Sequence, residues 1–118
     1  MAVEKHNIIQ EKSYDLALKV IDIVKKLPRN TEGFIVGNQF GRAGTAVGAN
    51  VEEAIGAFSK DDFIYKMSIA LKEARETHYW LRLIRDSKLI ASNDIDLLIS
   101  ETEEVKRILG AIIKSSKS

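Results

Sequence analysis

The sequence predicts an all-α fold, an up-down-up-down bundle of four helices in which neighbouring helices run antiparallel. Apolar residues recur at spacings of three and four along four separate segments, which is the period of one helix face. The only proline, Pro28, stands between the first two segments. The links hold only a few residues each, and short links favour helices that reverse direction over long crossovers.

The first helix is expected over residues 10–27 and the second over residues 32–58. Leu16, Val20, Ile23 and Leu27 share one face of the first segment, and Pro28 disfavours helical backbone at the residue before it. Asn30 and Thr31 are candidate N-caps for the second helix. Its predicted seam consists of Val36, Phe40, Ala43, Val47, Asn50, Ala54 and Ala57.

The third helix, expected over residues 60–86, has the clearest pattern. Ser59 and Asp62 have the spacing of a capping box, with Asp in place of the usual Glu. An unbroken heptad seam then runs through Phe63, Met67, Ala70, Ala74, Thr77, Leu81 and Ile84.

The last helix is expected over residues 93–114, after the cap candidates at 92–94. Its predicted seam consists of Ile95, Leu98, Thr102, Val105, Leu109 and Ile112. The four helices together predict one domain over residues 1–118.

Composition supports this single domain and limits the cellular compartments in which we expect the protein. The 118 residues are 45% hydrophobic and 30% charged, which is usual for one folded unit. The chain has no cysteine, so it forms neither a disulfide nor a thiolate metal site. No apolar run approaches the ~20 residues that span a bilayer, and no signal-peptide core precedes Lys12. We therefore expect a cytoplasmic protein without membrane contact.

The residues needed for catalysis or metal binding are scarce. The two histidines, His6 and His78, lack the Glu-x-x-His spacing of di-iron bundles. With no cysteine and so few histidines, no Ser-His-Asp or Cys-His set can be assembled. The sequence predicts no enzyme, no metal, no cofactor and no small-molecule substrate.

A stripe of glycines marks the second helix. Gly37, Gly41, Gly44 and Gly48 recur at spacings of four, three and four, which places them on one face. Each costs about 0.8–1 kcal/mol relative to alanine within a helix, so a close contact should offset the loss. That contact is either a neighbouring helix of the same bundle or another subunit.

Asn50 is predicted on the apolar seam of the second helix. A buried amide needs hydrogen-bond partners, and we expect it to fix helix register through Glu53, Arg42 or the third helix. A ligand contact is the alternative.

The third helix also combines cations with aromatic residues, as RNA-binding surfaces do. Trp80 and Leu83 are interpreted as a second apolar stripe, buried against the first helix or a partner subunit. The net charge of only +1 does not by itself indicate a nucleic-acid binder. The candidate phosphate-binding residues are Lys66, Lys72, Arg75, Arg82, Arg85 and Lys88.

Residues 37–54, together with 59–63, 66–77 and 79–81, resemble the bacterial four helix bundle protein family, also called 23S rRNA-intervening sequence proteins. The resemblance covers about residues 14–113 and implies a homo-oligomeric, pentameric barrel, often encoded inside intervening sequences of ribosomal RNA genes. The positions that match the family's motifs, and that we interpret as framework polar groups, are Arg42, Asn50, Glu53, Glu73, Glu76 and Trp80.

The resemblance, the net charge and the glycine-lined face of the second helix leave three alternative functions. The first is an oligomeric scaffold that binds structured RNA or DNA weakly through phosphate contacts. The second is a protein-interaction module without a nucleic-acid role. The third is an accessory protein to a retroelement reverse transcriptase, because a relative with this fold has that role and a basic surface, a surface that the net charge of +1 does not match.

Overall fold

The computed structural model describes residues 2–91 and 93–118, with side chains from residue 8 onward. It contains four α-helices: α1 (Ala2–Lys26), α2 (Thr31–Ile55), α3 (Lys60–Asp86) and α4 (Asp94–Lys117). The described residues include no strand. The predicted all-α fold with four helices is therefore confirmed.

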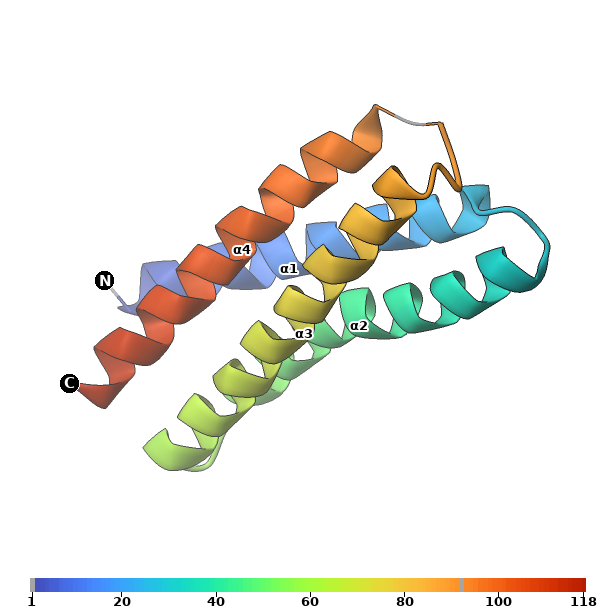
Figure 1. Ribbon diagram of the computed structural model, residues 1–118. Coiled ribbons are helices and arrows are strands. Elements are labelled where there is room, and N and C mark those ends of the chain that lie inside the picture. Colours follow the sequence, from blue (N-terminus) through green and yellow to red (C-terminus); the bar gives the residue numbers. More distant parts are fainter. Residues whose placement is uncertain (1, 92) are drawn as a thin grey trace.

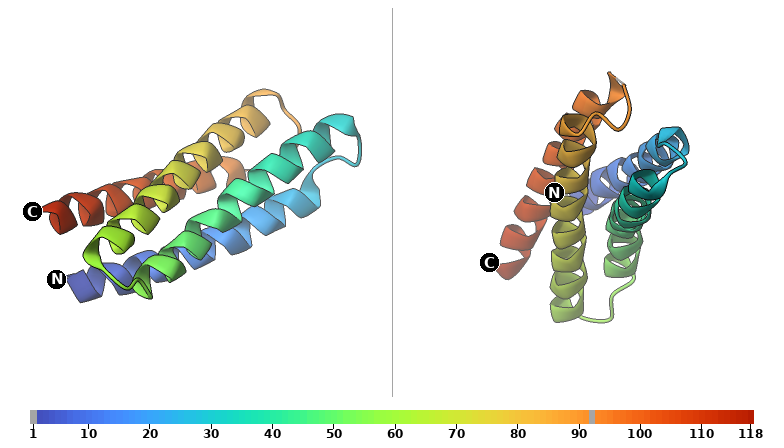
Figure 2. Two further views of the ribbon diagram at one scale, coloured as in Figure 1. Left: turned by 90° about the horizontal axis from the view of Figure 1, so that it is seen from below. Right: turned by 45° about the vertical axis from the view of Figure 1, so that its right-hand side comes forward.

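The helices form an elongated ring with extents of 45 × 22 × 18 Å. Each helix packs against its neighbours in chain order, and α4 closes the ring against α1. Both termini lie at one end of the bundle together with the α2–α3 link, and the other two links lie at the opposite end (Figures 1 and 2). Within the described residues, α1 and α3 face each other diagonally without packing together.

The core follows the predicted seams of α3 and α4 closely. Every seam residue of α3 after Phe63 is completely buried, and Phe63 itself is half-buried. All six predicted seam residues of α4 are buried as well. On α1, Ile9 and Ser13 extend the predicted stripe towards the N-terminus.

The seam of α2 differs from the prediction at its C-terminal end. Val51 is completely buried, whereas Asn50 lies half-buried at the edge of the core. The buried positions of α2 pass from Val47 to Val51 and Ala54, so the step after Val47 is four residues rather than the predicted three. Asn50 is therefore not a core residue.

Three helix limits also differ from the expected ones by three residues or more. Helix α1 begins at Ala2 rather than at residue 10, since no helix-breaking residue precedes that position. Helix α2 ends at Ile55 rather than at residue 58, and the N–H of Gly56 donates to the carbonyl of Glu52. Helix α4 continues to Lys117, beyond the predicted end at residue 114.

Side-chain caps start α2 and α3. The Asn30 Oδ1 accepts a hydrogen bond from the N–H of Gly33 at 2.9 Å, and the Ser59 Oγ accepts one from the N–H of Asp62 at 3.0 Å. The α1–α2 link also requires a glycine, because a Cβ on Gly33 would lie 1.8 Å from the carbonyl oxygen of Pro28. Asn93 makes no side-chain cap bond at the start of α4.

No helix among the described residues is both long and apolar enough to span a membrane.

Candidate nucleic-acid interface

The glycine stripe of α2 faces α1. A Cβ on Gly37, Gly41, Gly44 or Gly48 would meet Leu27, Val24, Val20 or Ser13, respectively. The sequence left open whether the glycines meet a neighbouring helix or another subunit, and the structure places them against a neighbouring helix of the same bundle. It lets the backbones of α1 and α2 approach closely, so it is not the surface available to a partner.

Four of the motif residues form one polar network between α2 and α3. The Arg42 guanidinium donates to Glu73 at 3.1 Å through Nη1 and to Glu76 through Nη2. The Trp80 indole N–H donates to the same Glu76 carboxylate at 3.0 Å. Glu73 is only 8% exposed, so Arg42 compensates a carboxylate that is nearly removed from water.

The network also changes the proton affinity of its members. The hydrogen bond from the Trp80 indole, followed by that from Arg42, lowers the pKa of Glu76 below its ordinary value. The hydrogen bonds to Glu76 and Glu73 raise the pKa of Arg42. The Glu76 carboxylate is therefore ionised and paired at neutral pH.

Asn50 and Glu53 lie outside this network. The Asn50 Nδ2 donates to the carbonyl of Ala46 in its own helix at 2.8 Å, rather than to Glu53, Arg42 or α3 as expected from the sequence. Glu53 instead pairs with Lys66 across the α2–α3 groove at 2.7 Å.

The six candidate cations fall into three groups: two that are paired, one in the link after α3, and three unpaired ones on α3. Lys66 is paired with Glu53, and Arg85 with Asp86 at 2.8 Å and Asp96 at 3.6 Å. Lys88 lies in the link after α3 with a positive φ of 58°. Lys72, Arg75 and Arg82 are exposed and have no ion pair with any described residue.

The three unpaired cations share one face of α3. Residues three, four and seven apart lie together on a helix surface, so Lys72, Arg75, Tyr79 and Arg82 form a continuous row. We call these four residues the α3 ridge. Tyr79 is 48% exposed, and its ring meets Trp80 edge-on, with ring centroids 5.0 Å apart and an interplanar angle of 74°.

The predicted burial of Trp80 and Leu83 against the first helix is wrong, since α1 and α3 do not pack together within the described residues. Trp80 is half-buried at the edge of the core, where Glu76 holds its indole N–H. Leu83 is 37% exposed beside the ridge. The sequence pattern could not assign these two side chains because helix order around the ring is a tertiary property.

Charged residues surround His78 between α3 and α4, beside the ridge. Its Nε2 lies 3.1 Å from an Oε1 of Glu103. Burial lowers the pKa of His78, Lys106 lowers it further, Glu103 raises it, and Arg82 and Arg85 add smaller lowering effects. The imidazole is therefore held neutral by its surroundings, and Glu103 is already paired with Lys106 at 2.7 Å.

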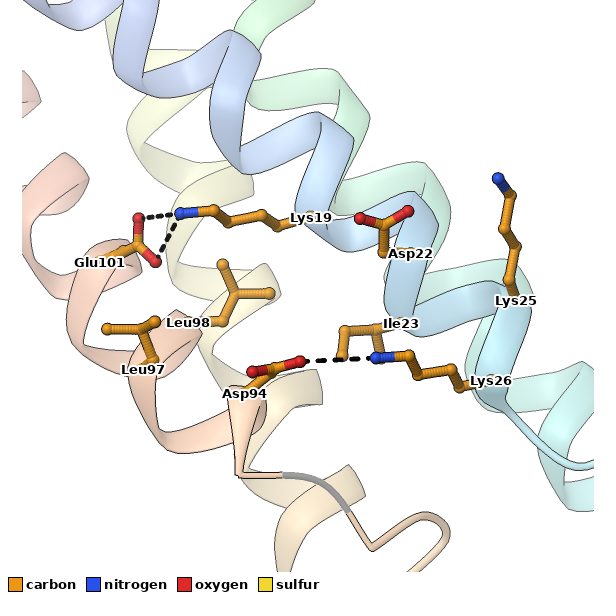
Figure 3. A pocket seen from close by; sticks show the side chains of 9 residues that line it. All are labelled: Lys19, Asp22, Ile23, Lys25, Lys26, Asp94, Leu97, Leu98 and Glu101. Carbon is orange, nitrogen blue, oxygen red and sulfur yellow. Dashed lines mark hydrogen bonds and ion pairs between the residues drawn. The ribbon is translucent and has the colours of Figure 1, made fainter.

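A cleft of about 460 Å³ separates α1 from α4 towards the end of the bundle that holds the α1–α2 and α3–α4 links. Figure 3 shows two ion pairs across it, Lys19 with Glu101 and Lys26 with Asp94, with the apolar side chains of Leu97 and Leu98 between them. Glu101 and Asp94 are thus engaged by lysines, and the described side chains contain no group of three or more His, Asp or Glu that could hold a metal ion.

Comparisons with known proteins agree on the family. A family model described as 23S rRNA-intervening sequence protein matches residues 5–111. A crystal structure from Bacteroides thetaiotaomicron, of a protein with unknown function from the S23 ribosomal protein family, is 37% identical. It superposes with a TM-score of 0.86, covering 93% of this chain and 98% of the other. Among curated proteins, none matches.

Proposed function

The chain belongs to the 23S rRNA-intervening sequence protein family, and we propose that it is a non-enzymatic scaffold that binds nucleic acid through phosphate contacts. In this proposal the subunit is an up-down-up-down antiparallel bundle that assembles as a homo-oligomer, with five copies as the resemblance suggests. The phosphate contacts are made by the α3 ridge.

One observation carries the nucleic-acid part of the proposal. Lys72, Arg75 and Arg82 stand together without ion pairs, while the nearest carboxylates of α3 are already engaged. Glu73 and Glu76 are held by Arg42, and Asp86 by Arg85. The ridge therefore has a local positive charge that the overall net charge of +1 conceals.

The expected affinity of one subunit for nucleic acid is modest. Three phosphate contacts would give a slope of about −2 to −3 for the logarithm of affinity against the logarithm of salt concentration. In an oligomer, several ridges on one particle would raise the avidity by about 10²–10⁴-fold. Weak binding by the monomer and salt-sensitive binding by the assembly are both consistent with this arrangement.

The outer face of α1 supports the homo-oligomer. Tyr14, Leu18 and Ile21 occupy successive turns and are 66%, 49% and 43% exposed, respectively. A contiguous apolar row of this kind is usually covered by another molecule, and we propose that a second copy of this chain covers it. Light scattering of the protein and of Leu18→Glu tests this: the variant should have a smaller mass with unchanged helicity, and an unchanged mass would contradict the proposed contact.

The nucleic-acid proposal is tested by mobility shifts with structured RNA and duplex DNA at two salt concentrations. The test variant carries Lys72→Glu, Arg75→Glu and Arg82→Glu. The control carries the same charge change at exposed lysines of other surfaces, Lys25→Glu, Lys60→Glu and Lys114→Glu. The ridge variant should lose binding and the control should retain most of it, whereas equal losses, or no binding by the parent at low salt, would overturn the proposal.

A protein-interaction module is the second candidate, and the apolar row on α1 is the observation that favours it. If the parent fails to bind nucleic acid at low salt and scatters light as a monomer, that row is open to a different protein. A partner that is retained after nuclease treatment and lost with Leu18→Glu would support this alternative.

A further inference from the structure

We infer that the α3 ridge takes a single-stranded nucleic acid, with one base stacked on Tyr79 and phosphates bound by the cations on either side. This inference rests on the proposed function and specifies its ligand. It depends on the position of α3 in the bundle, on the contacts of the Tyr79 ring and on the hydrogen bonds that engage the carboxylates beside it.

The shape of the bundle disfavours contact between α3 and the bases of a duplex. An isolated helix fits a major groove about 12 Å wide, because its own diameter is about 10–12 Å. Here α3 is flanked by α2 and α4 in a bundle with cross-sectional extents of 22 × 18 Å, so only its outer row can touch a ligand. A duplex resting on this row would expose its backbone to the cations and keep its bases out of reach.

Tyr79 is placed for stacking between two cations. Arg75 lies one helical turn before it and Arg82 one turn after it on the same face. The two arginines are seven residues apart, which corresponds to about 10 Å along the helix and leaves room for a base between the bound phosphates. Stacking on an aromatic ring does not depend on the base, so this arrangement predicts binding with little sequence preference.

The Tyr79 ring contacts Trp80 and is otherwise half-exposed. Trp80 meets it edge-on, and Trp80 is itself fixed by its hydrogen bond to Glu76. Tyr65, the other exposed tyrosine of α3, has the ammonium of Lys66 5.9 Å from its ring centroid. Tyr79 is therefore the better stacking platform of the two.

The carboxylates near Tyr79 do not oppose a phosphate strongly. Glu76 lies one turn before Tyr79, yet both Arg42 and Trp80 donate hydrogen bonds to it. The Arg42 network thus contributes to the proposed site indirectly, since Arg42 offsets one of the two carboxylate charges and Glu76 holds Trp80, the residue that supports Tyr79.

Fluorescence anisotropy with a labelled oligothymidylate and a labelled hairpin duplex tests the inference. Tyr79→Ala should weaken single-strand binding by about 5- to 100-fold and change duplex binding little. Tyr79→Phe should retain single-strand affinity, whereas Tyr79→Leu, which keeps the apolar bulk without the flat ring, should not. Tyr65→Ala, at the exposed tyrosine of α3 that lies outside the ridge, serves as the control, and circular dichroism checks that each variant is folded.

The outcomes separate this inference from the proposed function. If Tyr79→Ala changes nothing, or weakens duplex binding equally, the stacking inference is wrong, whether or not salt-sensitive binding persists through Lys72, Arg75 and Arg82. If neither oligothymidylate nor the duplex binds at low salt, the proposed function itself fails.

Discussion

Gly44 of α2 and Val20 of α1 lie so close that a Cβ on the glycine would be 2.6 Å from Cγ2 of the valine. Val20 is completely buried, and its branched side chain has little freedom to move aside. The α1–α2 approach therefore requires a residue without a side chain at position 44. This contact explains how α2 tolerates a residue that costs about 0.8–1 kcal/mol within a helix.

Gly44→Ala should lower the free energy of unfolding by about 1–3 kcal/mol, because the added methyl group overpacks a filled contact. Chemical denaturation monitored by circular dichroism measures the change. Gly110→Ala is the matched control: a Cβ there meets nothing within 4 Å, so the better helix propensity of alanine should stabilise the protein by about 0.5–1 kcal/mol. Equal effects of the two substitutions would contradict the close α1–α2 contact.

Val20→Ala should partly compensate for Gly44→Ala. Truncation of Val20 leaves a cavity by itself, and the methyl group on residue 44 would occupy part of that space. The double variant should therefore be more stable than the sum of the single effects predicts, by about 0.5–3 kcal/mol in a double-mutant cycle. Strict additivity would show that the two residues are not in contact.

Trp80→Phe should raise the pKa of Glu76 towards its ordinary value of 4.5, because the indole hydrogen bond is the largest cause of the lowered pKa. A lowered folded-state pKa contributes stability that is present above pH 4.5 and lost as the pH falls through the folded pKa. The variant should lose part of this acid-dependent stability. Carbon NMR titration of the Glu76 carboxyl measures the pKa, with Tyr79→Phe as the control that should leave it unchanged.

Lys19→Met should weaken the contact between α1 and α4, and the size of the effect should depend on salt concentration. The Lys19 ammonium lies 2.6 Å from Glu101 and 3.0 Å from Asp15, and partly exposed pairs of this kind contribute about 0.2–1 kcal/mol. The loss in unfolding free energy should shrink in 1 M salt, where the screening length is about 3 Å. Lys25→Met removes an exposed lysine without an ion pair among the described residues and should have little effect at either salt concentration.

The ion pair of Lys19 with Glu101 also makes the free energy of unfolding depend on pH in the alkaline range. The hydrogen bonds to Glu101 and then Asp15 raise the pKa of Lys19 above 10.5. Its contribution to stability is therefore complete below pH 10.5 and is lost as the pH rises through the folded pKa. Glu101→Gln should reduce this alkaline loss, and an unchanged alkaline profile would show that the pair contributes nothing.

Ser59→Ala should lower the free energy of unfolding by about 1 kcal/mol, since the Ser59 hydroxyl caps the N–H of Asp62 at the start of α3. Asn93→Ala at the start of α4 is the comparison. Asn93 makes no side-chain cap bond, so its removal should change stability by less than about 0.5 kcal/mol. Thermal unfolding of the two variants side by side distinguishes a real cap from a residue that only resembles one in sequence.

The sequence by itself determined the number of helices, the limits of α3 and the buried seams of α3 and α4. These features depend on residues close together in the chain, since a helix face, an N-cap and a proline break are all local. Thr77 and Thr102 were correctly placed in the core by periodicity alone, although they are polar, because each hydroxyl donates to a carbonyl of its own helix.

Only the tertiary structure decided which residues meet between helices. Arg42 and Glu76 are 34 residues apart, so their contact depends on how α2 and α3 are rotated about their axes. The same rotation turns the glycine stripe towards α1, leaves Val51 rather than Asn50 in the core, and separates the paired Lys66 and Arg85 from the unpaired residues of the α3 ridge. A helical repeat defines a face, but only packing sets the angle at which that face meets its neighbour.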